Sequence, residues 1–401
     1  MSIRVAALIA GILSVSAAWG GSSTSLAAAA RSILGANQGV YVEAADGTVL
    51  LSQAAESPVH PASVSKIATT LALLHKFGIE HRFTTVFATN GRISNGTLEG
   101  DLLVETDGDP YFVDENALLV AERLQQAGVQ RVSGTLRTRG PLTFDWDIDQ
   151  DGVRLRRALS GGAPAAAWIS VQGLGDSSAG VAAMPAIQFE NSAAVMATGP
   201  ERKLVIHRSQ PLLLLTKQLN DYSNNIFKPL ADAAGGAPAV EALARGVVPA
   251  IMQSEIILGD GAGTDPSNRL SPRAAVTLLR VLERELESSG HALCDILPVA
   301  GIDEGTLRKR LDGPGEAGHI VGKTGTFGDY GASALIGAIA TNERGTVYFA
   351  ILDHDVPVPI ARQRQDRFVR ALLGLFHTRA WDYQPDLRPA VARATAEIVQ
   401  P

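Results

Sequence analysis

Hydrophobic and polar positions alternate on both sides of an Asp46-Gly47 pair over residues 40–51. Alternation around Asp-Gly predicts a β-hairpin, because this pair favours the tight turns that join two strands. Pro61 then precedes ASVSKIATTLALLHKF, a stretch whose composition favours a helix. The pattern therefore predicts a hairpin that leads into a helix, with Ser63 in the first turn of that helix.

The pattern changes over residues 82–210, where short β-like runs such as TTVFAT and DLLVET are separated by Asn-Gly and Asp-Gly pairs. This spacing predicts short strands joined by tight turns. One amphipathic helix is expected over 115–127, and residues 153–197 are rich in Ala, Gly and Ser. We interpret the whole region as a mainly β domain inserted into the chain.

Helical patterns return after the insertion. A helix is expected over 211–233, and Ser271-Pro272 predicts the start of another, with Ser as the N-cap and Pro at the first helical position. Residues 319–353 contain three β-like runs joined by short turns, which predicts an antiparallel meander. A closing helix is expected over 358–376.

The N-terminal residues have the pattern of a secretory signal peptide. Arg4 precedes an apolar stretch over 5–18, which is short for a membrane span, and small residues follow. Cleavage is expected after Ala18 or in the alanine run 27–30, and an uncleaved membrane anchor is the alternative. No later run reaches eighteen apolar residues, so no stable span is expected after processing. We therefore expect a periplasmic or secreted protein of the bacterial cell envelope.

Composition excludes several classes of protein. The chain has 401 residues, 46% of them hydrophobic, and a net charge of −6. It can therefore bury a core, and it lacks the excess of cations typical of nucleic-acid binding. Cys294 is the single cysteine, which excludes an internal disulfide, and the eight histidines show no metal-ligand spacing. No cofactor and no metal are expected.

Three short motifs that carry hydroxyl, amide and ammonium groups occur in order along the chain. They are Ser63-Val64-Ser65-Lys66 (Ser-x-x-Lys), Ser223-Asn224-Asn225 (Ser-x-Asn) and Lys323-Thr324-Gly325 (Lys-Thr-Gly). Each motif alone is a weak signal. Their order is informative, because the first opens a helix, the second lies in a helical pattern and the third lies on an expected strand.

The first and third motifs can activate a serine nucleophile. Ser63 and Lys66 are three positions apart, so they share one face of a helix. Lys66 can accept the Ser63 proton only as a free amine, and lowering its pKa from about 10.4 to about 7 requires roughly 4–5 kcal/mol against the ammonium. Burial and a second cation both act in this direction, and Lys323 is the candidate cation.

The same elements can bind the substrate. The backbone N–H of Ser63 at the start of the helix and that of Thr326 on the strand are expected to stabilise an oxyanion. Gly325 would allow a substrate to approach the strand closely. Lys323 supplies a charge, and Thr324 and Thr326 supply hydroxyls, for a substrate carboxylate.

Three further segments complete a resemblance to a known family. They are FTTVFATNGRISNGTLEGDLLVETDGDPYF at 83–112, DGAGTDPSNRLSP at 260–272 and LPVAGIDEGTLRKRL at 297–311. With the three motifs, they resemble the D-alanyl-D-alanine carboxypeptidase/endopeptidase family, the class C low-molecular-mass penicillin-binding proteins of peptidase family S13. The similarity extends from about residue 36 to 355.

The resemblance implies a fold and an arrangement of domains. The fold is α+β, the penicillin-binding/β-lactamase-like transpeptidase fold, in which helices flank an antiparallel sheet, here with an inserted mainly β domain. We expect a signal peptide over 1–30, a catalytic domain over 31–81 and 211–380, the insertion over 82–210 and a C-terminal tail over 381–401.

The resemblance also implies an activity. It implies an exported serine DD-peptidase that cleaves D-Ala-D-Ala bonds of peptidoglycan stem peptides through an acyl-serine, and that β-lactam antibiotics acylate. The nucleophile would be Ser63 and the base Lys66. Ser223 and Asn225 would form the second motif, and Lys323 and Thr324 the third.

Alternatives remain open at this point. Tyr222-Ser223-Asn224 also fits Tyr-x-Asn, a motif of class C β-lactamases and related esterases, so a β-lactamase or an esterase of the same fold is one alternative. A class A β-lactamase is disfavoured, because the chain has no Glu-x-x-x-Asn sequence. A catalytically silent peptidoglycan-binding protein is another alternative. The sequence does not separate carboxypeptidase from endopeptidase activity.

Overall fold

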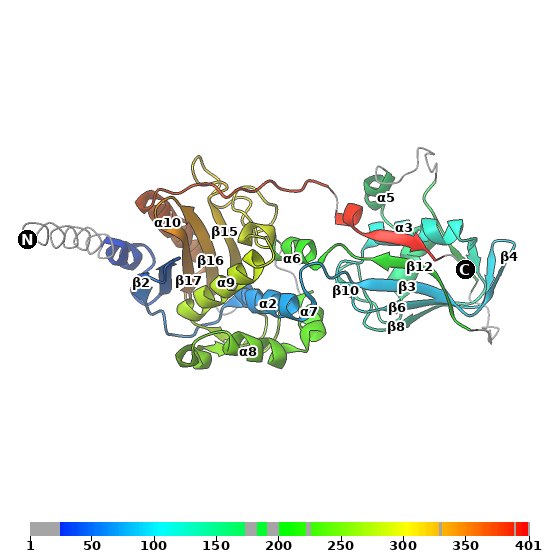
Figure 1. The fold of residues 1–401 in the computed structure, drawn as a ribbon, viewed down its shortest axis with the longest axis horizontal. Coiled ribbons are helices and arrows are strands. Elements are labelled where there is room, and N and C mark those ends of the chain that lie inside the picture. The colour runs from blue at the N-terminus through cyan, green and yellow to red at the C-terminus, as the bar shows by residue number, and fades with distance from the viewer. Residues whose placement is uncertain are drawn as a thin grey trace, which may run out of the picture. The chain divides into compact units, whose positions relative to one another are not determined.

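The computed structural model of the chain describes residues 25–172, 183–190, 200–221, 226–328, 331–388 and 390–399. The segment before residue 25, which contains most of the expected signal peptide, and the Ser-x-Asn motif lie outside these residues. The chain divides into two compact units, which are described separately below (Figure 1). The first unit comprises Met1–Lys76 and Thr216–Pro385, and the second Phe77–Leu215 and Asp386–Pro401.

A five-stranded antiparallel sheet in the order β15-β16-β17-β1-β2 forms the centre of the first unit. Its strands are β1 (Gly39–Ala44), β2 (Val49–Gln53), β15 (Ile320–Phe327), β16 (Ala332–Thr341) and β17 (Gly345–Asp353). The hairpin expected around Asp46-Gly47 is β1–β2, and the expected meander is β15–β16–β17, so both predictions are confirmed.

Helices cover both faces of this sheet. A helix over 25–33 and α10 (Val358–Leu375) contribute Leu26, Ala30 and Phe368 to a core that also contains Val40 and Val42 of β1. Successive side chains of a strand point to opposite faces. Glu43, which follows Val42, pairs with Arg280 of α9 (Pro272–Glu287), so α9 lies on the other face (Figure 1).

The start of α9 forms as expected, because Ser271 Oγ accepts a hydrogen bond from the N–H of Ala274 at 3.1 Å. Further helical elements that lie wholly or mainly in this unit are η1 (Ala62–Ser65), α2 (Lys66–Phe77), α6 (Leu212–Asp221), α7 (Phe227–Ala234), α8 (Ala237–Gly246), η3 (Ala250–Glu255) and η4 (Leu293–Asp295). Two short strands, β13 (Ile256–Ile257) and β14 (Arg269–Leu270), pair antiparallel. Among the described residues, no helix has both the length and the apolar character needed to cross a membrane.

The second unit contains two main sheets and its own core. A five-stranded sheet has the order β18-β12-β3-β6-β8, and a four-stranded sheet has the order β11-β7-β5-β4. The strands are β3 (Thr84–Thr89), β4 (Arg92–Ser94), β5 (Thr97–Glu99), β6 (Leu102–Thr106), β7 (Arg131–Val132), β8 (Leu136–Arg139), β11 (Gln188–Phe189), β12 (Arg202–Arg208) and β18 (Thr395–Ile398). A separate two-stranded hairpin joins β9 (Thr143–Phe144) to β10 (Asp147–Ile148).

Helix α3 (Asp114–Gln126) packs on the core of this unit and corresponds to the helix expected over 115–127. The first part of the Ala-rich stretch is helical, with α4 (Val153–Arg157), a π-helical turn (Ala158–Gly162) and α5 (Ala165–Gln172). Alanine has the highest intrinsic helix propensity, so this composition is compatible with helices inside a β-rich unit.

Of the expected C-terminal tail over 381–401, Asp386–Pro401 belongs to the second unit. After a short 3₁₀ turn (Ala390–Arg393), β18 pairs antiparallel with β12 through Val205, Ile206, His207 and Arg208. This pairing was not predictable from the sequence, because β18 is short and its partner strand lies almost two hundred positions earlier in the chain.

Candidate active site

Ser63 and Lys66 lie at the junction of two helical elements. Residues 62–65 form the single 3₁₀ turn η1, and α2 begins at Lys66. Lys66 Nζ donates a hydrogen bond to Ser63 Oγ at 2.8 Å. Both side chains are buried, with exposed fractions of 7% for Ser63 and 1% for Lys66. The structure therefore brings together the two residues of the Ser-x-x-Lys motif in a dry environment.

The surroundings of Lys66 disfavour its charged form. Burial lowers the pKa of Lys66 well below its ordinary value, and the charge of Lys323 lowers it further, while Asp260 opposes the shift. Lys66 Nζ also donates to the carbonyl of Ala262 and lies 5.3 Å from the ring centroid of Phe227. Burial and a nearby cation both favour the free amine of a lysine, the form that accepts a proton.

Lys323 lies on β15, which is the edge strand of the sheet. Its side chain is fully buried, and burial lowers the pKa to about 8, against the opposing effect of Asp221. The Lys323 Nζ atom donates to the carbonyl of Thr324 at 3.1 Å, and Thr324 Oγ1 donates to Thr306 Oγ1 at 2.7 Å. On the outer edge of β15, the N–H of Gly322, the residue before the Lys-Thr-Gly triplet, donates to the carbonyl of Pro298.

Gly325 fits closely against the turn that carries Ser63. A Cβ atom at this position would lie 2.5 Å from the carbonyl oxygen of Pro61 and 3.1 Å from the backbone nitrogen of Ser63. We expected this glycine to make room for a substrate. That expectation stays a prediction, and the contact adds a second reason for glycine, because a side chain here would collide with the backbone of η1.

Thr326 is exposed and accepts a hydrogen bond at Oγ1 from Arg362 Nη2 of α10 at 2.9 Å. The sequence analysis did not predict a role for Arg362, because α10 contains no motif that indicates a contact with Thr326. The guanidinium places a second cation beside the strand that carries Lys323, on the side expected to receive a carboxylate.

A loop over 260–268 supports Lys66 from the opposite side. Asp260 Oδ1 accepts hydrogen bonds from Gly263 N at 2.8 Å and Asn268 Nδ2 at 2.9 Å, and Oδ2 accepts from Thr264 N at 3.0 Å. Burial alone would raise the pKa of Asp260, but the bonds from Thr264 and Asn268 outweigh it and lower the pKa to about 2. The ionised Asp260 carboxylate therefore holds the loop that carries the Ala262 carbonyl.

The second motif lies outside the described residues, so the structure assigns no position to Ser223, Asn225 or the alternative residue Tyr222. The residue before it, Asp221, is buried, and its carbonyl accepts a hydrogen bond from Thr306 N at 3.1 Å. Burial raises the pKa of the Asp221 carboxyl to about 7, and the charges of Lys217 and Lys323 partly oppose this shift.

His60 supports the turn that carries Ser63. Its Nδ1 accepts the N–H of Ala62 at 3.1 Å, and its ring stacks on Phe327 with centroids 4.3 Å apart. Burial lowers the pKa of His60, which favours the neutral ring that this acceptor role requires. Cys294 lies in η4, and burial raises its pKa to about 11, so it is an unreactive packing residue.

Comparison with known proteins is consistent with this geometry. The family model described as D-Ala-D-Ala carboxypeptidase 3 (S13) family matches residues 23–143 and 180–372. A curated relative, carboxypeptidase DacB of Mycolicibacterium smegmatis, is 28% identical over 373 residues, which cover 84% of this chain and 80% of the relative.

Solved structures share the fold. The predatory endopeptidase Bd0816 of Bdellovibrio bacteriovorus, in complex with immunity protein Bd3460, is 23% identical, with a TM-score of 0.73 over 90% of this chain and 99% of the other. The penicillin G acylated endopeptidase Bd3459 of the same organism is 20% identical, with the same TM-score and coverage. The expected fold class and the resemblance drawn from the motifs are confirmed. The chain belongs to the D-Ala-D-Ala carboxypeptidase 3 (S13) family, and thus to the serine DD-peptidase hydrolases.

Proposed function

We propose that this protein is an exported DD-peptidase that cleaves the D-Ala-D-Ala bond of peptidoglycan stem peptides through an acyl-serine, and that β-lactams acylate the same serine. The observation that carries the proposal is the buried hydrogen bond of 2.8 Å between Lys66 Nζ and Ser63 Oγ. Membership of the family and its penicillin-acylated structural neighbour support the chemistry.

Acylation begins when Ser63 Oγ attacks the carbonyl carbon of the terminal peptide bond. Lys66, as the free amine, takes the hydroxyl proton, since burial and the Lys323 charge both favour its neutral form. The N–H groups of Ser63 and Thr326 stabilise the negative charge on the former carbonyl oxygen. Lys323 and the hydroxyls of Thr324 and Thr326 bind the terminal carboxylate.

The C–N bond then breaks, and D-Ala leaves after its amine receives a proton through Lys66 or Ser223. Water hydrolyses the ester in the second half-reaction and restores the Ser63 hydroxyl. A β-lactam forms the same ester, but its leaving amine stays tethered to the acyl group, which slows hydrolysis. In this mechanism Asn225, the last residue of the second motif, is expected to lie beside the substrate.

Labelling with a fluorescent penicillin tests the proposal. The wild-type chain should form a covalent adduct that survives denaturing electrophoresis, and Ser63→Ala should form none. Ser65→Ala is the matched control, because the Ser65 hydroxyl lies two positions away and donates to the Ala62 carbonyl at 3.0 Å. An unlabelled wild type, or a labelled Ser63→Ala variant, would overturn the proposed nucleophile.

Product analysis on purified muropeptides resolves the type of peptidase. Release of free D-Ala identifies carboxypeptidase activity, and resolution of cross-linked dimers identifies endopeptidase activity. Fast turnover of nitrocefin, with no product from muropeptides, would contradict the proposed substrate and favour a β-lactamase.

A further inference from the structure

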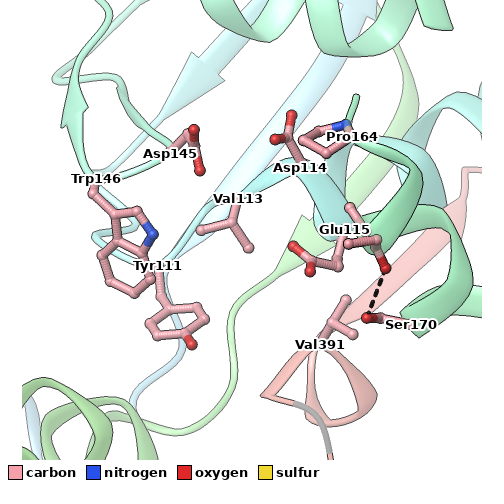
Figure 2. A pocket seen from close by; sticks show the side chains of 11 residues that line it. Tyr111, Val113, Asp114, Glu115, Asp145, Trp146, Pro164, Ser170 and Val391 are labelled. Atoms are coloured by element: carbon pink, nitrogen blue, oxygen red, sulfur yellow. Dashed lines mark hydrogen bonds between the residues drawn. The ribbon is translucent and has the colours of Figure 1, made fainter. Parts of the chain in front are cut away.

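The second unit contains a cavity of about 340 Å³ that the proposed peptidase chemistry does not use (Figure 2). All eleven residues that line it belong to this unit. Figure 2 shows Tyr111, Asp145 and Trp146 on one side and Glu115, Pro164 and Ser170 on the other, with Val113 between them. The lining of the cavity therefore contains two aromatic rings and three carboxylates.

The aromatic wall is held by an unusual turn. Asp145 and Trp146 are the two residues between β9 and β10, and both have positive φ angles, +49° and +68°. Two-residue turns of this type normally contain Asn and Gly, because other residues adopt this backbone at a cost. The turn presents a carboxylate and an indole to the cavity, and the Trp146 ring meets Tyr111 edge to face at 4.6 Å.

The opposite wall contains a carboxylate with one oxygen that no described residue hydrogen-bonds. Asp114, the first residue of α3, lines the cavity with only 5% of its surface exposed. Its Oδ1 atom has no hydrogen-bond partner among the described residues. Burial raises the pKa of Asp114, and the charges of Asp145 and Glu115 raise it further, while Arg157 opposes them. The ionised form of a buried carboxyl group beside other carboxylates is stabilised by a hydrogen-bond donor that carries positive charge.

The remaining lining residues do not supply that charge, since none of the eleven is a lysine, arginine or histidine. We propose that this cavity binds an organic cation, an ammonium or guanidinium group on a short apolar stem. Asp114, Glu115 and Asp145 would accept its N–H bonds, and the faces of Trp146 and Tyr111 would contact the charge. Val113 and Pro164 provide apolar surface for the stem. A neutral sugar would also stack on the rings, but it would bring no positive charge to the carboxylates.

Titration calorimetry on the full wild-type chain tests the proposal with three probes. They are acetyl-Gly-Lys-Gly-amide, the same peptide acetylated on the lysine Nε, and spermidine. We expect saturable binding of the first peptide, about tenfold weaker in Asp114→Asn and in Glu115→Gln, because each change removes a charge-assisted hydrogen bond. None of these probes ends in D-Ala-D-Ala, so failure of this proposal is distinguishable from failure of the proposed peptidase function.

Glu99→Gln is the matched control, because Glu99 is an exposed carboxylate on β5 of the same unit and does not line the cavity. It should leave the affinity unchanged. Glu115 is partly exposed, so Glu115→Gln keeps the test informative if Asp114→Asn fails to fold. Binding of the lysyl peptide identifies a peptide-borne cation, and binding of spermidine alone identifies a free polyamine. Absence of binding, equal binding of the Nε-acetylated peptide, or unchanged affinity in both carboxylate variants would overturn the proposal.

Discussion

A Cβ atom on Gly325 would lie 3.1 Å from the backbone nitrogen of Ser63. The strand that carries Lys-Thr-Gly and the turn that carries the proposed nucleophile are therefore in direct backbone contact. The same hypothetical atom would lie 2.5 Å from the carbonyl oxygen of Pro61, so neither backbone can stay in place if a side chain is added. The missing side chain sets the distance between the two motifs.

Gly325→Ala should therefore slow acylation by a fluorescent penicillin at least tenfold. It should also lower the free energy of unfolding in urea by about 1–3 kcal/mol, as overpacking commonly does. Gly374→Ala is the control, because a Cβ there meets no atom within 4 Å and the residue lies in α10. The control should acylate normally and gain up to about 1 kcal/mol of stability. Acylation of Gly325→Ala at the wild-type rate would contradict this account.

Local signals made much of the first unit predictable from the sequence. Alternation around Asp46-Gly47 and the three strand-like runs after residue 319 correctly predicted the strands of the central sheet. Ser271 correctly predicted the start of α9. The motif spacing also predicted the pairing of Ser63 with Lys66, because three positions in one helical turn place two side chains on one face.

Contacts between distant segments were not predictable. Arg362 reaches Thr326 from a helix that begins after the whole sheet is complete, and no pattern on α10 points to that contact. The pairing of β18 with β12 depends on a four-residue strand, which is too short for a periodic signal. The contact of Gly325 with Pro61 was not predictable either, since Pro61 is remote in sequence.

Lys323 predicts a pH dependence for substrates that carry a carboxylate. Burial lowers its pKa to about 8, so the ammonium is present below this pH and is lost above it. The kcat/KM for a peptide ending in D-Ala-D-Ala should fall as the pH rises through about 8. The C-terminal amide of the same peptide is the control, and its alkaline fall should be much smaller. Equal profiles for acid and amide would exclude Lys323 as the partner of the carboxylate.

Arg362 should strengthen binding of the same carboxylate. Its guanidinium donates to Thr326 Oγ1 at 2.9 Å, at the end of the strand that carries Lys323. Arg362→Gln should raise KM for the D-Ala-D-Ala peptide about tenfold and change kcat little, as expected for loss of one charge-assisted bond. Arg367→Gln, an exposed change on the same helix, serves as the control. An unchanged KM in Arg362→Gln would show that this cation does not contact the substrate.

Lys217 should contribute to the stability of the folded chain and take no direct part in catalysis. Its buried Nζ donates to Asp303 Oδ2 at 2.5 Å and to the carbonyl of Leu297 at 2.6 Å, and Tyr383 Oη donates to Asp303 Oδ1 at 2.6 Å. Lys217→Met leaves Asp303 buried without its cation and should lower the free energy of unfolding by about 3–5 kcal/mol. Lys309→Met, at an exposed position, should change it by less than about 0.5 kcal/mol. Equal urea midpoints for the two variants would contradict this assignment.

If the expected signal peptide is present, the helix over 25–33 predicts where it is cleaved. Leu26 and Ala30 are 3% and 0% exposed and belong to the core of the first unit, so cleavage inside the alanine run would remove core residues. We therefore expect a mature N-terminus before residue 25, consistent with cleavage after Ala18, and mass spectrometry of the exported protein measures it. Leu26→Ala should lower the free energy of unfolding by about 2–5 kcal/mol, whereas Ser32→Ala, on an exposed position of the same helix, should be nearly neutral. A mature protein that begins at residue 31 would show that the fold does not need this helix.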